Sequence, residues 1–265
     1  MTSEMLTGRT AVVTGGASGI GRATALLLAQ QGAKVFTADF SPLHDENDEQ
    51  FGELGIEQRQ CDVRSESELA AVFDVAAKSS GRVDILVNNA GIGMVKQIHD
   101  VSEADWDACI DTNLKAAFFG CKHAIRYMAA DGKGGAVVNV SSNAGILPRA
   151  HDPVYSISKL ALSGLTKSLA LCHSKDRIRV NAVCPGPVGG TRMIESELDA
   201  ADDRDLAIQN LIAASPLARA FGRMITPEEI AQAVLYLVSD AAIMVSGTLI
   251  TIDGGKSLGV PPQPE

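Results

Sequence analysis

The 265-residue sequence lacks long apolar runs, and its first residues lack positive charge. No stretch approaches the roughly 20 consecutive apolar residues that a membrane-spanning helix requires. The first six residues, Met-Thr-Ser-Glu-Met-Leu, carry neither the basic start nor the apolar segment of a secretory signal. We therefore expect no membrane span, no export signal and a cytoplasmic location.

Positive charge is scarce along the whole chain. Lys and Arg number 23 against 32 Asp and Glu, so the net charge is −9 and the pI is about 5.1. An acidic protein repels the phosphates of nucleic acids and the headgroups of anionic membranes. We expect neither as a partner.

The cysteines and histidines lack the spacings of disulfide frameworks and metal sites. The five cysteines are scattered, with no C-x-x-C pair, which is typical of reduced core thiols in a cytosolic protein. The five histidines show no ligand spacing either, so we expect no metal. These residues are Cys61, Cys109, Cys121, Cys172 and Cys184, and His44, His99, His123, His151 and His173.

What the sequence does contain is a regular alternation of strand-like and helix-like segments. Short apolar strands are predicted at 10–14, 34–39, 56–63, 83–87, 136–140, 178–183 and 248–252, with helical patterns between most of them. Such alternation predicts an α/β protein whose parallel sheet has helices on both faces. The hydrophobic fraction of 46% suffices for a sizeable core. We predict a single domain over 1–265, with a core of about 6–255 and a loosely held tail at 256–265.

A glycine-rich turn joins the first predicted strand to a helix predicted over 22–31. Its sequence is Gly15-Gly-Ala-Ser-Gly19-Ile-Gly21. In this position glycines let the backbone approach a phosphate, and the helix N-terminus offers free N–H groups. The spacing is G-x-x-x-G-x-G, and the alternative interpretation is a tight structural turn.

The second predicted strand ends on a carboxylate, Asp39, 18 residues after Gly21. An acidic group at about this distance can bind both ribose hydroxyls of an adenine nucleotide and repels a 2′-phosphate. The sequence places no Arg or Lys beside it, since Phe40-Ser-Pro follows. This favours NAD over NADP, and the alternative is a solvated carboxylate at a strand end.

Tyr155 and Lys159 lie four residues apart in a helical segment, so they share one helix face. A nearby ammonium favours the phenolate and would lower a tyrosine pKa from its usual value of about 10. The pair could therefore move a hydroxyl proton near neutral pH. Tyr127 and Tyr236 have an Asp at the same spacing instead.

Ligands of parallel sheets bind where the strands end. Several polar or glycine-rich segments follow predicted strands and should converge on one edge. They are 15–21, Asp39, Asp62, Asn88, Ser142 and 185–190.

On these motifs the chain resembles the short-chain dehydrogenase/reductase family, in its single-domain form of about 250 residues. The resemblance extends from Thr10 to Gly255 and implies a Rossmann-type, doubly wound parallel sheet. It rests on Thr14-Gly-Gly-Ala-Ser-Gly-Ile-Gly21, Asp62-Val63, Asn88-Asn-Ala-Gly91, Asn113, Ser142, Tyr155-x-x-x-Lys159 and Pro185-Gly186.

The resemblance implies the residues that bind the cofactor, NAD or NADH. Those around the pyrophosphate and adenosine are Gly15, Ser18, Gly19, Ile20, Gly21, Asp39, Asp62 and Val63. Those around the nicotinamide and its ribose are Asn88, Ala90, Gly91, Tyr155, Lys159, Pro185, Gly186 and Val188. The family has a Thr five residues after this proline, where the present sequence has Gly190 followed by Thr191.

The resemblance also implies four catalytic residues. Tyr155 is the acid or base, Lys159 lowers its pKa, Ser142 binds the substrate oxygen, and Asn113 kinks its helix and holds a water of the proton relay. The pocket is expected to be mainly apolar and to include Val188 and the segment after Thr191. Its other expected residues are Gly93, Met94, Ala144, Ile146, Leu147 and His151, although for His151 a position in a surface loop is the favoured interpretation.

We therefore expect an NAD-dependent oxidoreductase that transfers hydride between nicotinamide and a secondary alcohol or ketone. A 3-oxoacyl-[acyl-carrier-protein] reductase is the second possibility, but that activity usually uses NADPH, which Asp39 opposes. A non-enzymatic NAD-sensing regulator is the third, and the retained Ser, Tyr and Lys argue against it. The family further implies a homotetramer in which the Asn113 and Tyr155 helices pair between subunits.

Overall fold

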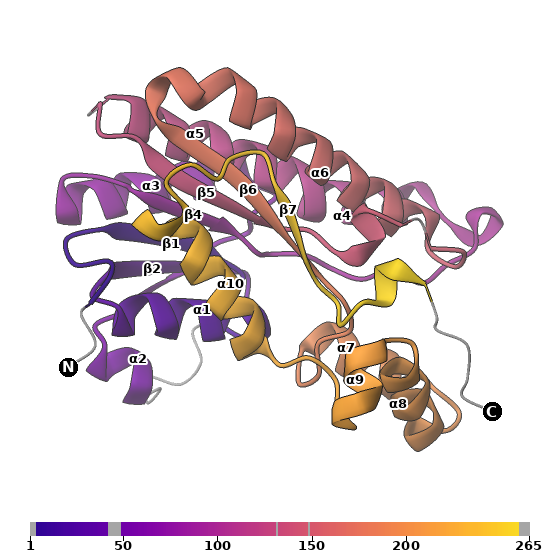
Figure 1. The fold of residues 1–265 in the computed structure, drawn as a ribbon. Coiled ribbons are helices and arrows are strands. Elements are labelled where there is room, and N and C mark those ends of the chain that lie inside the picture. Colours follow the sequence, from indigo (N-terminus) through magenta and orange to yellow (C-terminus); the bar gives the residue numbers. More distant parts are fainter. Residues whose placement is uncertain (1–3, 42–48, 131, 148, 260–265) are drawn as a thin grey trace.

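Seven parallel strands form one continuous twisted sheet in the computed structural model, which describes residues 4–41, 49–130, 132–147 and 149–259 (Figure 1). Their order is β3-β2-β1-β4-β5-β6-β7, so the direction of winding reverses between β1 and β4. The strands are β1 Thr10–Thr14, β2 Lys34–Asp39, β3 Glu57–Gln60, β4 Ile85–Asn88, β5 Gly135–Val140, β6 Ile178–Pro185 and β7 Leu249–Ile252.

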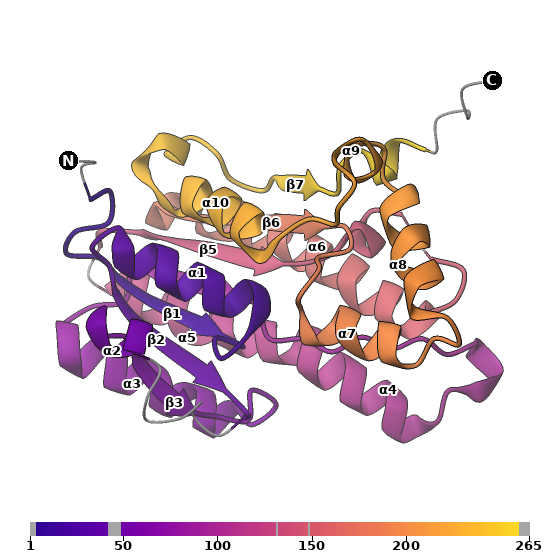
Figure 2. The same cartoon turned by 90° about the horizontal axis from the view of Figure 1, so that it is seen from below.

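Helices cover both faces of the sheet (Figure 2). In β1, Ala11 and Val13 pack in one core cluster and Val12 in the other, as the alternation of side chains along a strand requires. The first cluster includes residues of α1 and α10, the second residues of α3 and α5. The central strands β1, β4 and β5 are mostly apolar because neither face of the sheet meets water.

The helices begin and end close to the local signals in the sequence. Ser65, Ser102 and Thr226 each cap a helix N-terminus through their side chains, and the last two form complete capping boxes. The helices are α1 Gly19–Gln30, α2 Glu49–Glu53, α3 Glu66–Ser80, α4 Glu103–Ile110, α5 Ala116–Ala130, α6 Pro153–His173, α7 Arg192–Asp199, α8 Arg204–Ala213, α9 Pro216–Phe221 and α10 Pro227–Val238.

Several predicted boundaries were wrong. α1 begins three residues earlier than predicted, within the glycine-rich turn itself. The helix predicted over 113–130 continues one that starts at Glu103, and a π-helical segment, Asp111–Lys115, joins α4 to α5. The predicted tail starts with a 3₁₀ turn, Lys256–Leu258, while its residues 260–265 lie outside the described part, as do 42–48 with His44.

No helix in the described ranges combines the length and the apolar character that crossing a bilayer requires.

Candidate active site

Loops at the carboxyl ends of the strands enclose a cavity of about 490 Å³. The segments predicted to converge do so, apart from Asn88, because β1, β2, β4, β5 and β6 all deliver residues to it. The predicted cofactor and catalytic residues among its lining are Gly15, Ser18, Gly19, Ile20, Asp39, Asp62, Val63, Ala90, Gly91, Ser142, Tyr155, Lys159, Pro185, Gly186 and Val188.

The glycine-rich turn presents the open N-terminus of α1 to the cavity. Its N-cap, Ser18, makes no side-chain capping bond, unlike the caps of α3, α4 and α10. Ser18 therefore supplies no side-chain acceptor to the first N–H groups of α1, which suits a phosphate site. Gly15 and Gly19 have φ of +66° and +52°, which favours glycine at both.

Gly21 does not line the cavity, although it was predicted to bind the cofactor. It shapes the glycine-rich turn indirectly, through close packing against neighbouring residues. A Cβ at this position would lie 2.0 Å from the carbonyl oxygen of Gly15 and 2.4 Å from Nδ2 of Asn89. Only glycine lets the first turn of α1 lie this close to the turn before it.

Asp39 lies at one end of the cavity, at the end of β2. Its carboxylate accepts hydrogen bonds from the backbone N–H groups of Ala17, at 3.0 Å, and Ser41, at 2.9 Å. No Arg or Lys adjoins Asp39 in the sequence, but the guanidinium of Arg192 donates to Oγ of Ser41, two residues further on, at 3.3 and 3.4 Å. Arg192 follows Ser41 by 151 residues, so only tertiary structure brings them together.

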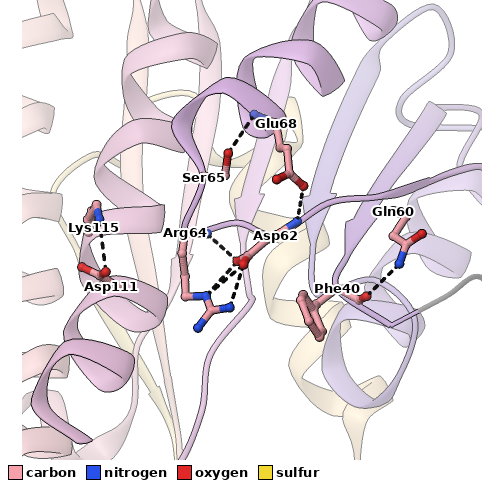
Figure 3. A network of polar contacts seen from close by, with 8 residues as sticks. All are labelled: Phe40, Gln60, Asp62, Arg64, Ser65, Glu68, Asp111 and Lys115. Carbon is pink, nitrogen blue, oxygen red and sulfur yellow. Dashed lines mark hydrogen bonds and ion pairs between the residues drawn. The ribbon is translucent and has the colours of Figure 1, made fainter. Parts of the chain in front are cut away.

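Arg64 fixes the carboxylate of Asp62 at the same end of the cavity (Figure 3). Nε of Arg64 lies 2.9 Å from Oδ1 and Nη2 lies 2.7 Å from Oδ2, and these bonds hold the pKa of Asp62 below its usual value. The guanidinium also lies 5.9 Å from the centre of the exposed Phe40 ring. The sequence analysis missed Arg64 and Phe40, although both adjoin predicted residues.

In the segment after β4, Asn89 rather than Asn88 lines the cavity. The buried Asn88 points into the core, where its Nδ2 donates to Oδ1 of Asn139 at 2.8 Å. Asn88, which was predicted to border the cofactor, therefore lies outside the lining of the cavity. Asn89 donates from Nδ2 to the carbonyl oxygens of Thr14 and Gly15, at 3.0 and 2.9 Å, which ties this segment to the glycine-rich turn.

The other end of the cavity holds Ser142, Tyr155 and Lys159, all three buried. Nζ of Lys159 donates to the carbonyl oxygen of Val140 at 3.1 Å and lies 5.8 Å from the centre of the Tyr155 ring. Oγ of Ser142 accepts from the N–H of Ala144 at 3.1 Å, which fixes the serine at the end of β5. The three groups are thus gathered on α6 and the end of β5.

The pKa of Tyr155 is raised above its usual value, mainly because the side chain is buried; Ser142 and then Arg149 oppose the rise. Burial also lowers the pKa of Lys159, to about 8. The groups that oppose the rise do not include Lys159, so its predicted lowering of the pKa of Tyr155 stays a prediction. Burial of a phenol disfavours its charged form.

Asn113 lies behind the site, in the π-helical segment, and does not line the cavity. Its amide pairs with the backbone of Ile92, accepting from N–H at 2.8 Å and donating to the carbonyl oxygen at 3.0 Å. Nδ2 also lies 3.1 Å from Oγ of Ser158 on α6. The helix irregularity predicted at Asn113 is present, and the side chain joins the segment after β4 to α6.

None of the six residues first predicted for the substrate lines the cavity: Gly93, Met94, Ala144, Ile146, Leu147 and His151. Ala144 lies in a 3₁₀ turn, Asn143–Gly145, and is fully buried in a cluster with Tyr155 and Val154. His151 pairs through Nδ1 with Gln97, at 3.2 Å. The described lining at this end is Ile92, Asn143, Arg149, Met193, Ile194, Glu197, Leu211 and Lys256.

The segment after β6 does line the cavity as predicted, from Pro185 to Val188 and from Thr191 to Ile194. The hydroxyl of Thr191 donates to the carbonyl oxygen of Val188 at 2.8 Å. A Cβ added to Gly19 would lie 3.2 Å from the methyl group of Thr191, so this segment passes directly over the glycine-rich turn.

Comparison with known proteins agrees with this geometry. The family model described as Enoyl-(Acyl carrier protein) reductase matches residues 15–257. The chain belongs to the short-chain dehydrogenase/reductase family. The family is one of oxidoreductases that use nicotinamide cofactors, and its members share this Rossmann-type sheet.

Three similar members of the short-chain dehydrogenase/reductase family illustrate its range. Cis-4-hydroxycyclohexanecarboxylate dehydrogenase of Sinomonas cyclohexanicum is 39% identical over 95% of this chain and 98% of its own. A 3-oxoacyl-[acyl-carrier-protein] reductase of Thermotoga maritima is 38% identical over 94% and 98%. The ligand-free structure of Thermoplasma acidophilum aldohexose dehydrogenase is 31% identical, covers 98% of both chains and has a TM-score of 0.87.

The residues present fit a dinucleotide of the kind used by short-chain dehydrogenases/reductases. The uncapped N-terminus of α1 suits the pyrophosphate, and Asp39 suits a ribose. Tyr155 and Lys159 line the opposite end of the same cavity, where the reactive ring would need them.

Proposed function

We propose that this protein is an NAD-dependent dehydrogenase of a secondary alcohol, or a reductase of the corresponding ketone. One observation carries the proposal: Ser142, Tyr155 and Lys159 line the same cavity as the open N-terminus of α1 and Asp39. A proton-transfer group and a dinucleotide cradle in one cavity are what hydride transfer to or from a carbinol carbon requires.

When bound, the nicotinamide supplies or accepts the hydride. Tyr155 gives a proton to the carbonyl oxygen in reduction and takes the hydroxyl proton in oxidation. Ser142 hydrogen-bonds that oxygen while charge develops on it.

NAD is favoured over NADP by the carboxylate of Asp39, which would repel a 2′-phosphate. Two backbone N–H groups fix this carboxylate, so it cannot turn away without leaving both unpaired. Arg64, which also lines the cavity, is bound through Nε and Nη2 to the carboxylate of Asp62.

Separate titrations with NADH and NADPH, followed by fluorescence, test the cofactor. We expect NADH to bind at least ten times more tightly. Assays with a panel of ketones then test the reaction, by the loss of NADH absorbance. Equal or stronger binding of NADPH would contradict the NAD assignment.

Arg192 favours one alternative, a 3-oxoacyl-[acyl-carrier-protein] reductase that uses NADPH. Its guanidinium lies at Ser41, two residues beyond Asp39, where it could attract a 2′-phosphate. The similarity to the Thermotoga maritima reductase supports the same possibility. Turnover of an acetoacetyl carrier protein with NADPH, but not NADH, would favour this alternative.

We also propose a homotetramer in which the α4–α5 run and α6 pair between subunits. Large apolar side chains on these helices are exposed in the single chain, namely Trp106, Phe118, Ile157 and Leu160. Sedimentation velocity tests this proposal, and a monomer at micromolar concentration would contradict it.

A further inference from the structure

Two cationic side chains from distant segments line the catalytic end of the cavity, and the proposed reaction gives neither a role. Arg149 precedes α6, and Lys256 follows β7. The guanidinium carbon of Arg149 lies 5.8 Å from the centre of the Tyr155 ring, so this cation lies over the ring of the residue that transfers the proton. The pyrophosphate of the cofactor is expected at the N-terminus of α1, so these two cations are not needed to bind it. They remain available to bind the substrate.

Arg149 is held by one edge only. Its Nε pairs with the buried carboxylate of Asp152 at 3.0 Å, and Asp152 is itself fixed by Oγ of Ser156 at 2.9 Å. Among the described residues no acceptor binds the Nη groups of Arg149. The anchored edge orients the guanidinium and leaves its other N–H donors available.

Lys256 is positioned by the backbone around it. The buried carboxylate of Asp253 accepts from the N–H groups of Gly255, at 2.9 Å, and Ser257, at 2.8 Å, so the turn carrying Lys256 wraps around it. The ammonium itself makes no hydrogen bond or ion pair with the described part of the chain. It is a half-buried cation on a rigid turn with three unmatched donors.

The two cations are close enough to repel each other. Burial and then the charge of Arg149 lower the pKa of Lys256, while Glu197 and Asp253 oppose this. Asp253 already accepts from two backbone N–H groups, and Glu197 is exposed, so water screens it. An anion between Arg149 and Lys256 would relieve the repulsion and accept the unmatched N–H donors.

We propose that Arg149 and Lys256 bind the carboxylate of a hydroxy acid or oxo acid whose alcohol or ketone carbon reacts at Tyr155. The apolar side chains of Ile92, Met193 and Leu211 line the same cavity and suit the hydrocarbon part between the two groups. This inference rests on the proposed function and names the substrate class of that site.

Matched pairs of oxo acids and their neutral amides test it with NADH as the reductant. The pairs are 3-oxobutanoate, 4-oxopentanoate and 4-oxocyclohexanecarboxylate, each against its carboxamide. We expect kcat/KM of the best acid to exceed that of its amide at least tenfold, because a charge-assisted hydrogen bond is lost with the amide. Equal turnover, or preference for the amide, would overturn the inference and leave the proposed dehydrogenase intact.

Lys256→Met should raise KM for the acid about ten- to a hundredfold, leave kcat within about threefold, and leave KM for the amide unchanged. Lys256→Arg keeps the charge and should retain most of the affinity. Lys78→Met, on the exposed side of α3, is the control and should change KM and kcat for neither the acid nor the amide. An equal loss for acid and amide would show a structural role only and overturn the assignment.

If Lys256→Met does not fold, which circular dichroism would show, the wild-type comparison of acid with amide still decides. Failure to reduce any of the six compounds with either NADH or NADPH would contradict the proposed function, and the inference with it. The two failures are therefore distinguishable.

Discussion

Arg192 donates two hydrogen bonds to the hydroxyl of Ser41, at 3.3 and 3.4 Å, and so joins the start of α7 to the loop after β2. Their sequence neighbours Asp39 and Thr191 both line the cavity. The pairing places one positive and one negative group at the ribose end. Which of them prevails decides the choice between NAD and NADP.

Asp39→Asn removes the negative charge and should shift the preference toward NADPH. We expect NADPH affinity to rise about tenfold, through lost repulsion and the attraction of Arg192. Adding Arg192→Met should reverse most of that gain, whereas Arg126→Met, on the exposed side of α5, should not. Fluorescence titration measures all four proteins, and no change in NADPH affinity would contradict the role of Asp39.

Tyr155→Phe removes the hydroxyl that transfers the proton and keeps the buried ring. The expected loss is about 10²- to 10⁴-fold in kcat, the usual contribution of acid–base catalysis. NADH affinity should change little, because the ring still fills its place. Full turnover by this variant would show that the proposed mechanism is wrong.

Lys159→Met should stabilise the protein while abolishing its activity. Burial lowers the pKa of Lys159 in the folded state from 10.5 to about 8, a shift equivalent to about 3 kcal/mol. Below about pH 8, Lys159 is protonated in both the folded and the unfolded protein, so its burial destabilises the folded protein by this full amount. Since Nζ also bonds the Val140 carbonyl, we expect a net gain of about 1–3 kcal/mol at pH 7.

The advantage of Lys159→Met should shrink as the pH rises. Between about 8 and 10.5 the unfolded chain binds more protons at Lys159 than the folded protein, so wild-type stability from this group increases with pH. Urea denaturation at pH 7, 8.5 and 9.5 checks the trend. A constant difference across this range would contradict a buried ammonium.

Asn113→Ala should destabilise the protein by about 2–3 kcal/mol, because the N–H and the carbonyl of Ile92 both lose their partner. The segment after β4 would then be less tightly joined to α6. Urea denaturation measures the loss. Asn210→Ala, on α8 and exposed, is the control and should cost less than about 0.5 kcal/mol.

Gly21→Ala should abolish cofactor binding or folding, since its Cβ would lie 2.0 Å from the backbone oxygen of Gly15. Gly164→Ala is the matched control within α6, where a Cβ would meet nothing within 4 Å. Alanine is the better helix former, so this control should gain about 0.5–1 kcal/mol. Calorimetry and NADH titration compare the two variants, and equal behaviour would contradict the packing role of Gly21.

Much of the fold could be predicted because its signals are local. Apolar runs mark β1 and β4, and Ser65, Ser102 and Thr226 mark helix starts through their own side chains. Boundaries were less predictable where the signal is not local. The π-helical segment joins α4 to α5 because Asn113 bonds to Ile92, which lies 21 positions earlier.

The sequence by itself determined the parallel sheet, the glycine-rich turn, and the meeting of Asp39, Asp62 and Ser142 at one cavity. Strand ends of a parallel sheet share an edge, whatever the packing around them. Only the tertiary structure decided that Asn88 faces the core, that Arg192 reaches Ser41, and that Arg149 and Lys256 face one cavity. Those placements, and the raised pKa of Tyr155, depend on burial and on contacts between segments far apart in the chain, which carry no local pattern.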